Sequence, residues 1–246
     1  MDRLLYVAMS GAKETLRAQA SNNHNLANAS TTGFRADLAA FQARAVEGSG
    51  YGTRVYATSA NTGFDSTSGA LQQTGRDLDV AVRGDGFLAV QGLDGREAYT
   101  RAGDLRIEPD GSLRTGTGLQ VMGDGGPVSV PPANSVTIGS DGSVSVVPLG
   151  QGPETRAVVG RIKLVKPEPT QLDRGADGLF RLRDGSDAPA DASVSLAQGA
   201  LESSNVNVAD AMVTMIELAR RFDLQVKAMR SAEDNGAAAA KLLSVG

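Results

Sequence analysis

The chain has no cysteine and no tryptophan, and it has a single histidine among 246 residues. Without cysteine there is neither a disulfide framework nor a thiolate nucleophile. The lone histidine, His24, has no second histidine or cysteine to complete a zinc ligand set. It also gives no support to a Ser-His-Asp triad. We therefore expect no catalytic residue, no metal site and no cofactor-binding residue.

Basic charge, aromatic residues and long apolar runs are also scarce. The net charge is −4, which argues against a nucleic-acid partner, and aromatic residues make up 4% of the chain, which disfavours a large aromatic core. No apolar run approaches the roughly 18 residues of a membrane span, so we expect no membrane insertion. The apolar stretch Leu4–Met9 is too short for a signal-peptide core. If the protein leaves the cytoplasm, we expect a route without a cleaved signal.

Apolar residues recur at helical spacing at both ends of the chain. The steps of four and three are those of a heptad repeat. Asn207 is placed to cap the C-terminal helix, and Asp210 lies in its first turn; Asp2 could cap the first helix. Either helix could instead pack on one ordinary core. The two stripes consist of Leu5, Met9, Ala12, Leu16 and Leu26, and of Val208, Met212, Met215, Ala219, Phe222, Val226, Met229, Ala240 and Leu243.

The middle of the chain has the pattern of short β-strands. Leu78, Val80 and Val82 alternate with less apolar residues, and similar runs follow as far as residue 182. The predicted class is α+β, with terminal helices that pair and a central all-β domain. We expect a helical segment over 1–35, an extended connector over 36–76, the β domain over 77–198, and a second helical segment over 199–246.

Seven Asp-Gly dipeptides, from Asp85 to Asp184, punctuate the β region. They favour tight hairpin turns, because glycine accepts positive φ and aspartate tolerates it. A calcium site is disfavoured, because no Asp-x-Asp-x-Asp-Gly loop is present. A β-solenoid is disfavoured as well, because the spacing of the dipeptides is irregular.

Four motifs, in order along the chain, resemble those of the flagellar rod and hook protein family. The first is Ser21-Asn-Asn-His-Asn-Leu-Ala-Asn-Ala-Ser-Thr-Thr-Gly-Phe-Arg35, directly after the first helix. The others are Leu78-Asp-Val-Ala-Val-Arg-Gly-Asp-Gly-Phe87, Tyr99-Thr-Arg-Ala-Gly-Asp-Leu105 with Asp110-Gly-Ser-Leu-Arg-Thr115, and Leu201-Glu-Ser-Ser-Asn-Val-Asn-Val208. Leu88 stands where much of the family has a second phenylalanine.

The resemblance implies a non-enzymatic building block of the periplasmic rod in the flagellar basal body. It implies terminal helices paired into a coiled coil, passage unfolded through the flagellar type III export apparatus, and neighbouring rod proteins as partners in a helical hetero-polymer. The interface it implies comprises Leu5, Met9, Ala12, Leu16, Leu26, Asn28, Gly33, Phe34, Asn205, Val206, Asn207, Val208, Met212, Met215, Ala219, Phe222, Val226, Met229 and Leu243.

Three alternatives remain open at this point. The chain could be a distal-rod or other member of the same family. It could instead be a secreted β-rich binding domain whose terminal helices only cap it. A cytoplasmic hydrolase on a β-sandwich is the third, although one histidine provides no convergent acid, base and nucleophile.

Overall fold

The computed structural model describes residues 3–45 and 55–244 and divides the chain into two compact units. Unit 1 combines residues 1–29, 36–64 and 206–246. Unit 2 combines residues 30–35 with residues 65–205. Each unit is therefore assembled from segments far apart in the sequence, and the chain passes between the units more than once.

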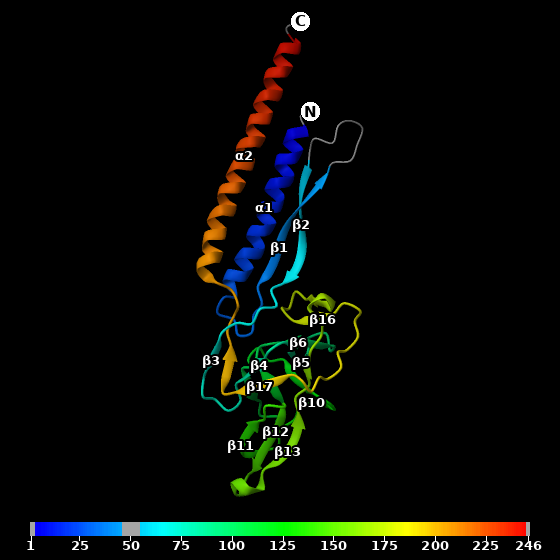
Figure 1. Ribbon diagram of the computed structural model, residues 1–246, viewed down its shortest axis with the longest axis vertical. Coiled ribbons are helices and arrows are strands. Elements are labelled where there is room, and N and C mark those ends of the chain that lie inside the picture. Colours follow the sequence, from blue (N-terminus) through cyan, green and yellow to red (C-terminus); the bar gives the residue numbers. More distant parts are fainter. Residues whose placement is uncertain (1–2, 46–54, 245–246) are drawn as a thin grey trace. The chain divides into compact units, whose positions relative to one another are not determined.

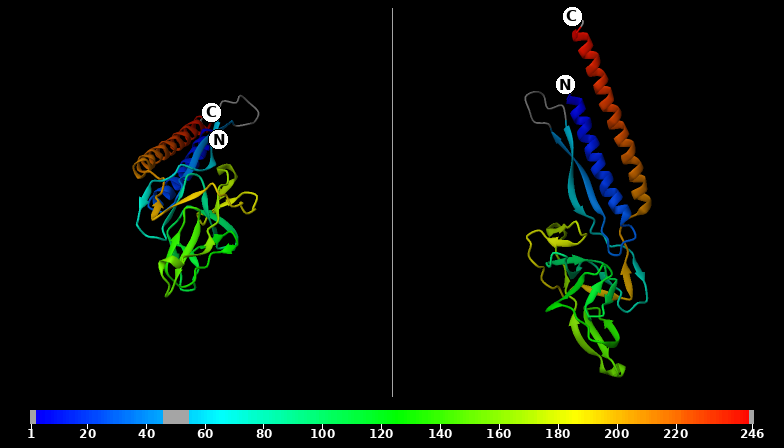
Figure 2. Two further views of the ribbon diagram at one scale, coloured as in Figure 1. Left: turned by 60° about the horizontal axis from the view of Figure 1, so that its bottom comes forward. Right: turned by 180° about the vertical axis from the view of Figure 1, so that it is seen from behind.

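Unit 1 contains the two long helices, α1 (Arg3–Ala27) and α2 (Val208–Ser244). The helices run antiparallel and lie side by side (Figure 1; Figure 2, right). The predicted start of α2 is confirmed, because Asn207 Oδ1 accepts the backbone N–H groups of Ala209 and Asp210 at 3.0 and 3.4 Å. The expected cap Asp2 lies outside the described residues, as does the side chain of Leu243.

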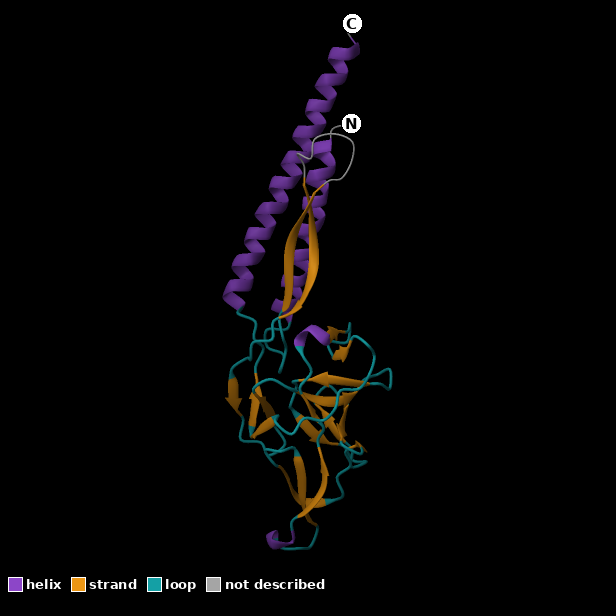
Figure 3. Cartoon of the chain, turned by 45° about the vertical axis from the view of Figure 1, so that its right-hand side comes forward, coloured by secondary structure: helices purple, strands orange, loops and turns teal. Residues whose placement is uncertain are grey.

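A long antiparallel hairpin replaces most of the expected connector. Strands β1 (Asp37–Ala45) and β2 (Val55–Phe64) pair with each other (Figure 3) and pack along α1, on the side away from α2 (Figure 1). The sequence DLAAFQARA gave no clear alternation of apolar and polar residues. Backbone pairing stabilises a hairpin without that alternation, so periodicity alone did not indicate these strands.

Unit 2 is the β-rich centre that the sequence predicts. Its largest sheet has nine strands in the order β15-β16-β6-β5-β9-β8-β7, with β10 on β9 and β14 on β5. A three-stranded sheet follows the order β11-β12-β13, and two pairs, β17-β4 and β18-β3, join late strands to early ones. The bounds are β3 Leu71–Gln73, β4 Val80–Arg83, β5 Phe87–Gln91, β6 Glu97–Thr100, β7 Leu105–Ile107, β8 Leu113–Thr115, β9 Gln120–Gly123, β10 Gly126–Pro127, β11 Ala133–Ile138, β12 Ser143–Pro148, β13 Ala157–Arg161, β14 Leu164–Val165, β15 Leu172–Arg174, β16 Phe180–Leu182, β17 Ser195–Gln198 and β18 Ala200–Glu202, with short 3-10 turns at Pro153–Thr155 and Pro169–Gln171.

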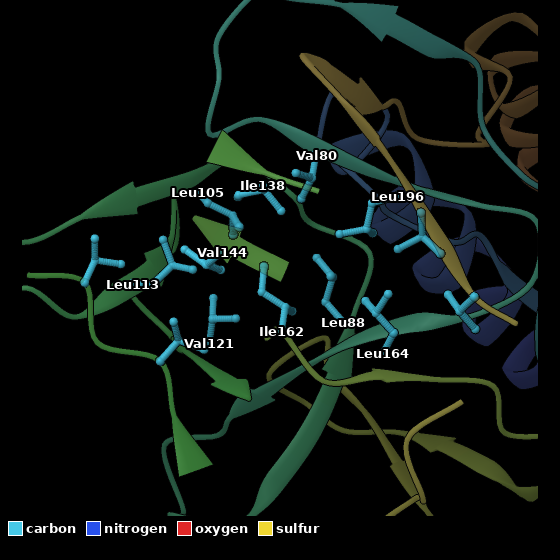
Figure 4. Packing of buried hydrophobic residues seen from close by; sticks show 14 of the residues in the cluster. Val80, Leu88, Leu105, Leu113, Val121, Ile138, Val144, Ile162, Leu164 and Leu196 are labelled. Atoms are coloured by element: carbon cyan, nitrogen blue, oxygen red, sulfur yellow. The ribbon is translucent and has the colours of Figure 1, made fainter. Parts of the chain in front are cut away.

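One aliphatic cluster forms the core of unit 2. It draws Leu88 and Leu105 from the nine-stranded sheet, Ile138 and Val144 from the three-stranded sheet, and Leu196 from β17 (Figure 4). Apart from Leu196, which is 2% exposed, these side chains have no more than 1% of their surface exposed. Branched aliphatic residues fill this core, which agrees with the low aromatic content.

Six of the seven Asp-Gly dipeptides lie in turns, as predicted, whereas Asp85-Gly86 lies between β4 and β5, which do not pair with each other. Those at Asp94, Asp110, Asp141 and Asp177 connect paired strands, and the glycine that follows each has φ between 79° and 84°. In each turn the aspartate Oδ1 also accepts the backbone N–H of the residue two positions on, at 2.9–3.2 Å. The pKa of all four carboxyl groups is lowered, first by a side-chain hydrogen bond from Arg96, Ser112, Ser143 or Arg181 and further by these backbone hydrogen bonds.

Candidate functional site

Two asparagines near the end of α1 tie the helix to other parts of unit 1, and a third caps it. Asn22 Nδ2 donates to the Ala211 carbonyl of α2 at 2.8 Å. Asn25 pairs with the backbone of Asp37 at the start of β1, donating to its carbonyl at 3.0 Å and accepting its N–H at 2.7 Å. Asn28 Nδ2 donates back to the His24 carbonyl at 2.9 Å, which satisfies one of the last helical acceptors.

His24 pairs with a carboxylate at the start of β1. Its Nδ1 lies 2.7 Å from Asp37 Oδ2, and both side chains are partly exposed. No group of three or more His, Asp or Glu side chains in the described ranges is placed to hold a metal ion. Likewise, no helix within those ranges is long and apolar enough to cross a membrane.

The contact between α1 and α2 is made of small and polar residues from α1. Ala8, Thr15 and Ala18 are buried, and a β-carbon placed on Gly11 would lie 2.9 Å from Gln225 Cδ of α2. On α2 the most buried residues are Ala211, Leu218 and Ala232, which are separated by seven and fourteen residues. Such separations fit a heptad repeat. The three residues, however, lie only partly on the helix face that the predicted apolar stripe occupies.

The predicted apolar stripes are therefore divided between a contact inside the chain and an open surface. Ala12 is buried, and Met215, Phe222 and Met229 are half-buried. Met9, Leu16, Val208 and Met212 are instead 52%, 51%, 42% and 49% exposed. The remaining stripe members described are half-buried (Leu5, Leu26 and Val226) or exposed (Ala219 and Ala240).

Large apolar side chains are exposed beyond the predicted stripes as well. On α1 the additional residue is Tyr6, which is 46% exposed. On α2 they are Val213, Ile216 and Leu224, which are 53–63% exposed. Both helices of unit 1 thus expose several large apolar side chains, and such side chains are candidates for a contact with another molecule.

Three of the predicted interface residues have their contacts inside unit 2. Gly33 has φ of 67°, and its N–H donates to the Glu202 carbonyl at 2.8 Å. Phe34 is 6% exposed, and its carbonyl accepts the N–H of Asn205 at 3.2 Å. The Asn205 side chain donates to the carbonyls of Asp65 and Thr67 at 3.2 and 3.0 Å. These residues join the points where the chain enters and leaves unit 2, and their role between subunits stays a prediction.

A buried ion network lies beside them. Glu202 is 1% exposed and forms two ion pairs. Its Oε1 lies 2.8 Å from Arg35 Nη2, and its Oε2 lies 2.7 Å from Arg101 Nη1. Its Oε1 also accepts the Gly69 N–H at 2.9 Å, while Arg101 donates to the carbonyls of Gly84 and Gly86. Burial, followed by the charge of Arg101, lowers the pKa of Arg35, although Glu202 acts in the opposite direction.

A stack of rings and guanidinium groups extends this network. The Arg174 guanidinium lies 4.2 Å from the centre of the Phe34 ring and 5.5 Å from that of Phe180, and it donates to the Arg35 carbonyl at 2.7 Å. Phe180 packs against Phe87, over which Arg101 lies at 5.5 Å. Such contacts between cations and rings hold the first segment of unit 2 against its sheet.

Sequence reasoning did not find the network of Arg35, Arg101 and Glu202. The three residues are far apart in the sequence, and no local spacing relates them. The sequence did contain one indication of the network. Arg35, Arg101 and Glu202 each lie inside one of the motifs quoted above. The motifs thus meet in space, where they provide packing and charge pairing.

Comparisons with known proteins agree with this arrangement. The family model described as the flagellar hook protein FlgE/F/G D1 domain matches residues 81–146, and that described as the flagellar basal body rod FlgEFG protein C-terminal matches residues 197–242. The chain is 45% identical to the flagellar basal-body rod protein FlgF of Salmonella typhimurium, with 100% of both chains covered. It is 35% identical to FlgF of Caulobacter vibrioides, with 93% of each covered. It is also 32% identical to the rod protein FlgG of Bacillus subtilis, with 95% of this chain and 96% of that one covered.

Proposed function

Because the chain belongs to the flagellar basal-body rod protein family, we propose that it polymerises through its terminal helices into the rod. It is a structural subunit of the flagellar basal-body rod, and its partners are other rod components. Among the rod proteins compared, the FlgF sequences from Salmonella typhimurium and Escherichia coli match over full length at 45% identity, against 32% for the FlgG sequence, which favours a FlgF-type subunit.

The observation that carries the proposal is the exposed apolar surface of α1 and α2. Met9 and Leu16 on α1, and Met212 and Ile216 on α2, are about half-exposed although both helices already pack on each other. Covering such side chains yields about 25 cal/mol per Å² of apolar surface. In the rod, the helices form a coiled-coil layer in which neighbouring subunits cover these residues.

The contacts between subunits are heterologous, since different faces of the same helices meet. Heterologous contacts that do not close on themselves generate helical tubes. The chain has no enzymatic role in this proposal, and it reaches the periplasmic rod unfolded, through the flagellar type III export apparatus. The absence of cysteine supports that route, because no stray disulfide can form once the chain leaves the cytoplasm.

The test is incorporation of variants in cells that lack the native gene. Met212→Asp places a carboxylate on the exposed surface of α2, where covering it would cost several kcal/mol in every subunit. We expect the variant to fold as a monomer but to be absent from isolated basal bodies, and the cells to be non-motile.

Ser231→Asp is the matched control, because it adds the same charge at an exposed polar position of the same helix. It should be incorporated. Phe222→Asp should impair both folding and incorporation, because Phe222 is already half-buried in the single chain. Motile cells with Met212→Asp in their rods would refute the proposed surface.

A further inference from the structure

We propose that Glu202 is a closing latch. Unit 2 stays open until residues 195–205 have been synthesised and Glu202 can pair with Arg35 and Arg101. The inference rests on the proposed function, because a chain exported unfolded must not fold before export. The inference concerns the order in which unit 2 folds. It gives the buried Arg35–Glu202–Arg101 network a role that is separate from the pairing of the terminal helices.

The strand topology places the closing contacts at the end of the unit. β4 pairs only with β17 within its sheet, and β3 only with β18. Leu196 of β17 enters the aliphatic core beside Val80 and Val82 of β4. Residues 195–202 therefore supply the partners for the first strands of the unit, and until they arrive β4 has an unpaired edge and an uncovered apolar side.

The buried charges of Arg35 and Arg101 also require Glu202 before unit 2 can close. Arg35 and Arg101 are both about 2% exposed at their side chains, and Glu202 is the carboxylate that contacts both of them. Without Glu202, closing the unit would bury two guanidinium groups beside each other, and uncompensated buried charge strongly disfavours the closed state. The Glu202 carboxylate also accepts a hydrogen bond from the Gly69 N–H, and the Glu202 carbonyl accepts one from the Gly33 N–H. A single residue therefore joins the segments that contain Gly33, Gly69 and Arg101.

The latch matters because synthesis of the chain is slower than folding of a β-rich domain. At about 5–20 residues per second, synthesis needs about 10–40 s to reach residue 202. Domains rich in β-structure fold within milliseconds to seconds once their contacts are available. A unit that could close from residues 30–190 alone would do so during synthesis. Because its last ties come from residues 195–205, the chain stays open for most of that time.

The test is the kinetics of the full-length chain. Glu202→Gln removes the charge and keeps the shape, and Glu97→Gln is the matched control, because Glu97 pairs with Lys163 inside the same unit at 2.8 Å. If the latch forms last, Glu202→Gln should speed unfolding on the order of 100-fold or more and leave refolding within about twofold of the parent. Glu97→Gln should change unfolding far less.

Asn205→Ala provides a milder second variant, because it removes the side-chain ties to Asp65 and Thr67 without changing a charge. It should show the same signature, with faster unfolding and unchanged refolding, even if Glu202→Gln does not fold. Refolding slowed in proportion to the loss of stability would overturn the proposal, because the latch would then form early. Equal rates for Glu202→Gln and Glu97→Gln would overturn it as well. Neither result bears on incorporation into the rod, so the two proposals fail separately.

Discussion

The glycine of the first motif offers a quantitative test of how unit 2 is held together. Gly33 combines two constraints that occur separately elsewhere in the unit. Its φ of 67° lies in the left-handed region, and a β-carbon added to it would lie 2.6 Å from the Ala102 nitrogen and closer still to the Arg101 carbonyl. Gly75 has a similar φ of 71° with no atom within 4 Å of the added carbon. Gly103 has the close approach without the positive φ, because its added carbon would collide with the Val80 carbonyl oxygen and would lie 2.8 Å from the carbonyl carbon.

The three alanine variants therefore separate two energies. The left-handed conformation costs an alanine about 1–2 kcal/mol. Crowding a packed site costs about 1–3 kcal/mol. We expect Gly75→Ala to lower the free energy of unfolding by about 1 kcal/mol, Gly103→Ala by about 1–3 kcal/mol, and Gly33→Ala by about 2–5 kcal/mol.

The assay is urea unfolding of the full-length variants, followed by near-ultraviolet circular dichroism. Tyr99 reports on unit 2, because it is 1% exposed and its hydroxyl oxygen accepts the Ala188 N–H at 2.6 Å. If Gly33→Ala and Gly75→Ala cost the same within about 0.5 kcal/mol, the close approach to Arg101 contributes nothing and the reasoning is refuted. A neutral Gly103→Ala would refute it as well.

Three further predictions concern charge, turns and order. Burial, followed by the nearby Asp79 carboxylate, raises the pKa of Asp104, so its charged form destabilises the fold at pH 7. Asp104→Asn should therefore raise the melting temperature at pH 7, and the gain should disappear near pH 4; no gain at pH 7 would contradict this. Gly111→Val should destabilise more than Gly95→Val, since φ is about 80° at both but only Gly111 has a neighbour, the Val130 carbonyl oxygen at 2.7 Å from an added carbon; equal melting temperatures would reject the close approach. In dilute monomer, amide exchange should be slow at residues 30–35 and 201–205 and fast in both helices, which packing inside one chain leaves marginal; helices as protected as unit 2 would contradict it.

The turn aspartates predict how unit 2 responds to acid. Hydrogen bonds from Ser112 lower the pKa of Asp110, and those from Ser143 lower the pKa of Asp141. Their folded pKa values lie below the unfolded value of about 3.9, so their stabilisation is complete above that pH and is lost as the pH falls through the folded values.

Much of this architecture is predictable from local patterns. The Asn207 cap and the apolar spacing indicate α2, and alternation around Val80 and Val82 indicates β4. Turn chemistry identifies the Asp-Gly hairpins, since aspartate and glycine are required there for separate physical reasons. These features depend on residues close in the sequence.

Other features depend on contacts that a local pattern does not contain. The face of α1 turned to α2 consists of residues such as Gly11, Thr15 and Asn22, which carry no apolar signal, so the predicted stripe marks the open surface as much as the contact between the helices. The β1–β2 hairpin lacks alternation and relies on backbone pairing. Glu202 meets Arg35 across most of the chain, and only the fold shows that they are neighbours.

The most direct measurement is a density map of isolated basal bodies from cells that produce this chain. The account predicts that helices 3–27 and 208–244 lie within the rod and that neighbouring subunits cover Met9 and Met212, which are half-exposed in the single chain. A rod in which these two side chains face open solvent, or from which the chain is absent, would contradict it.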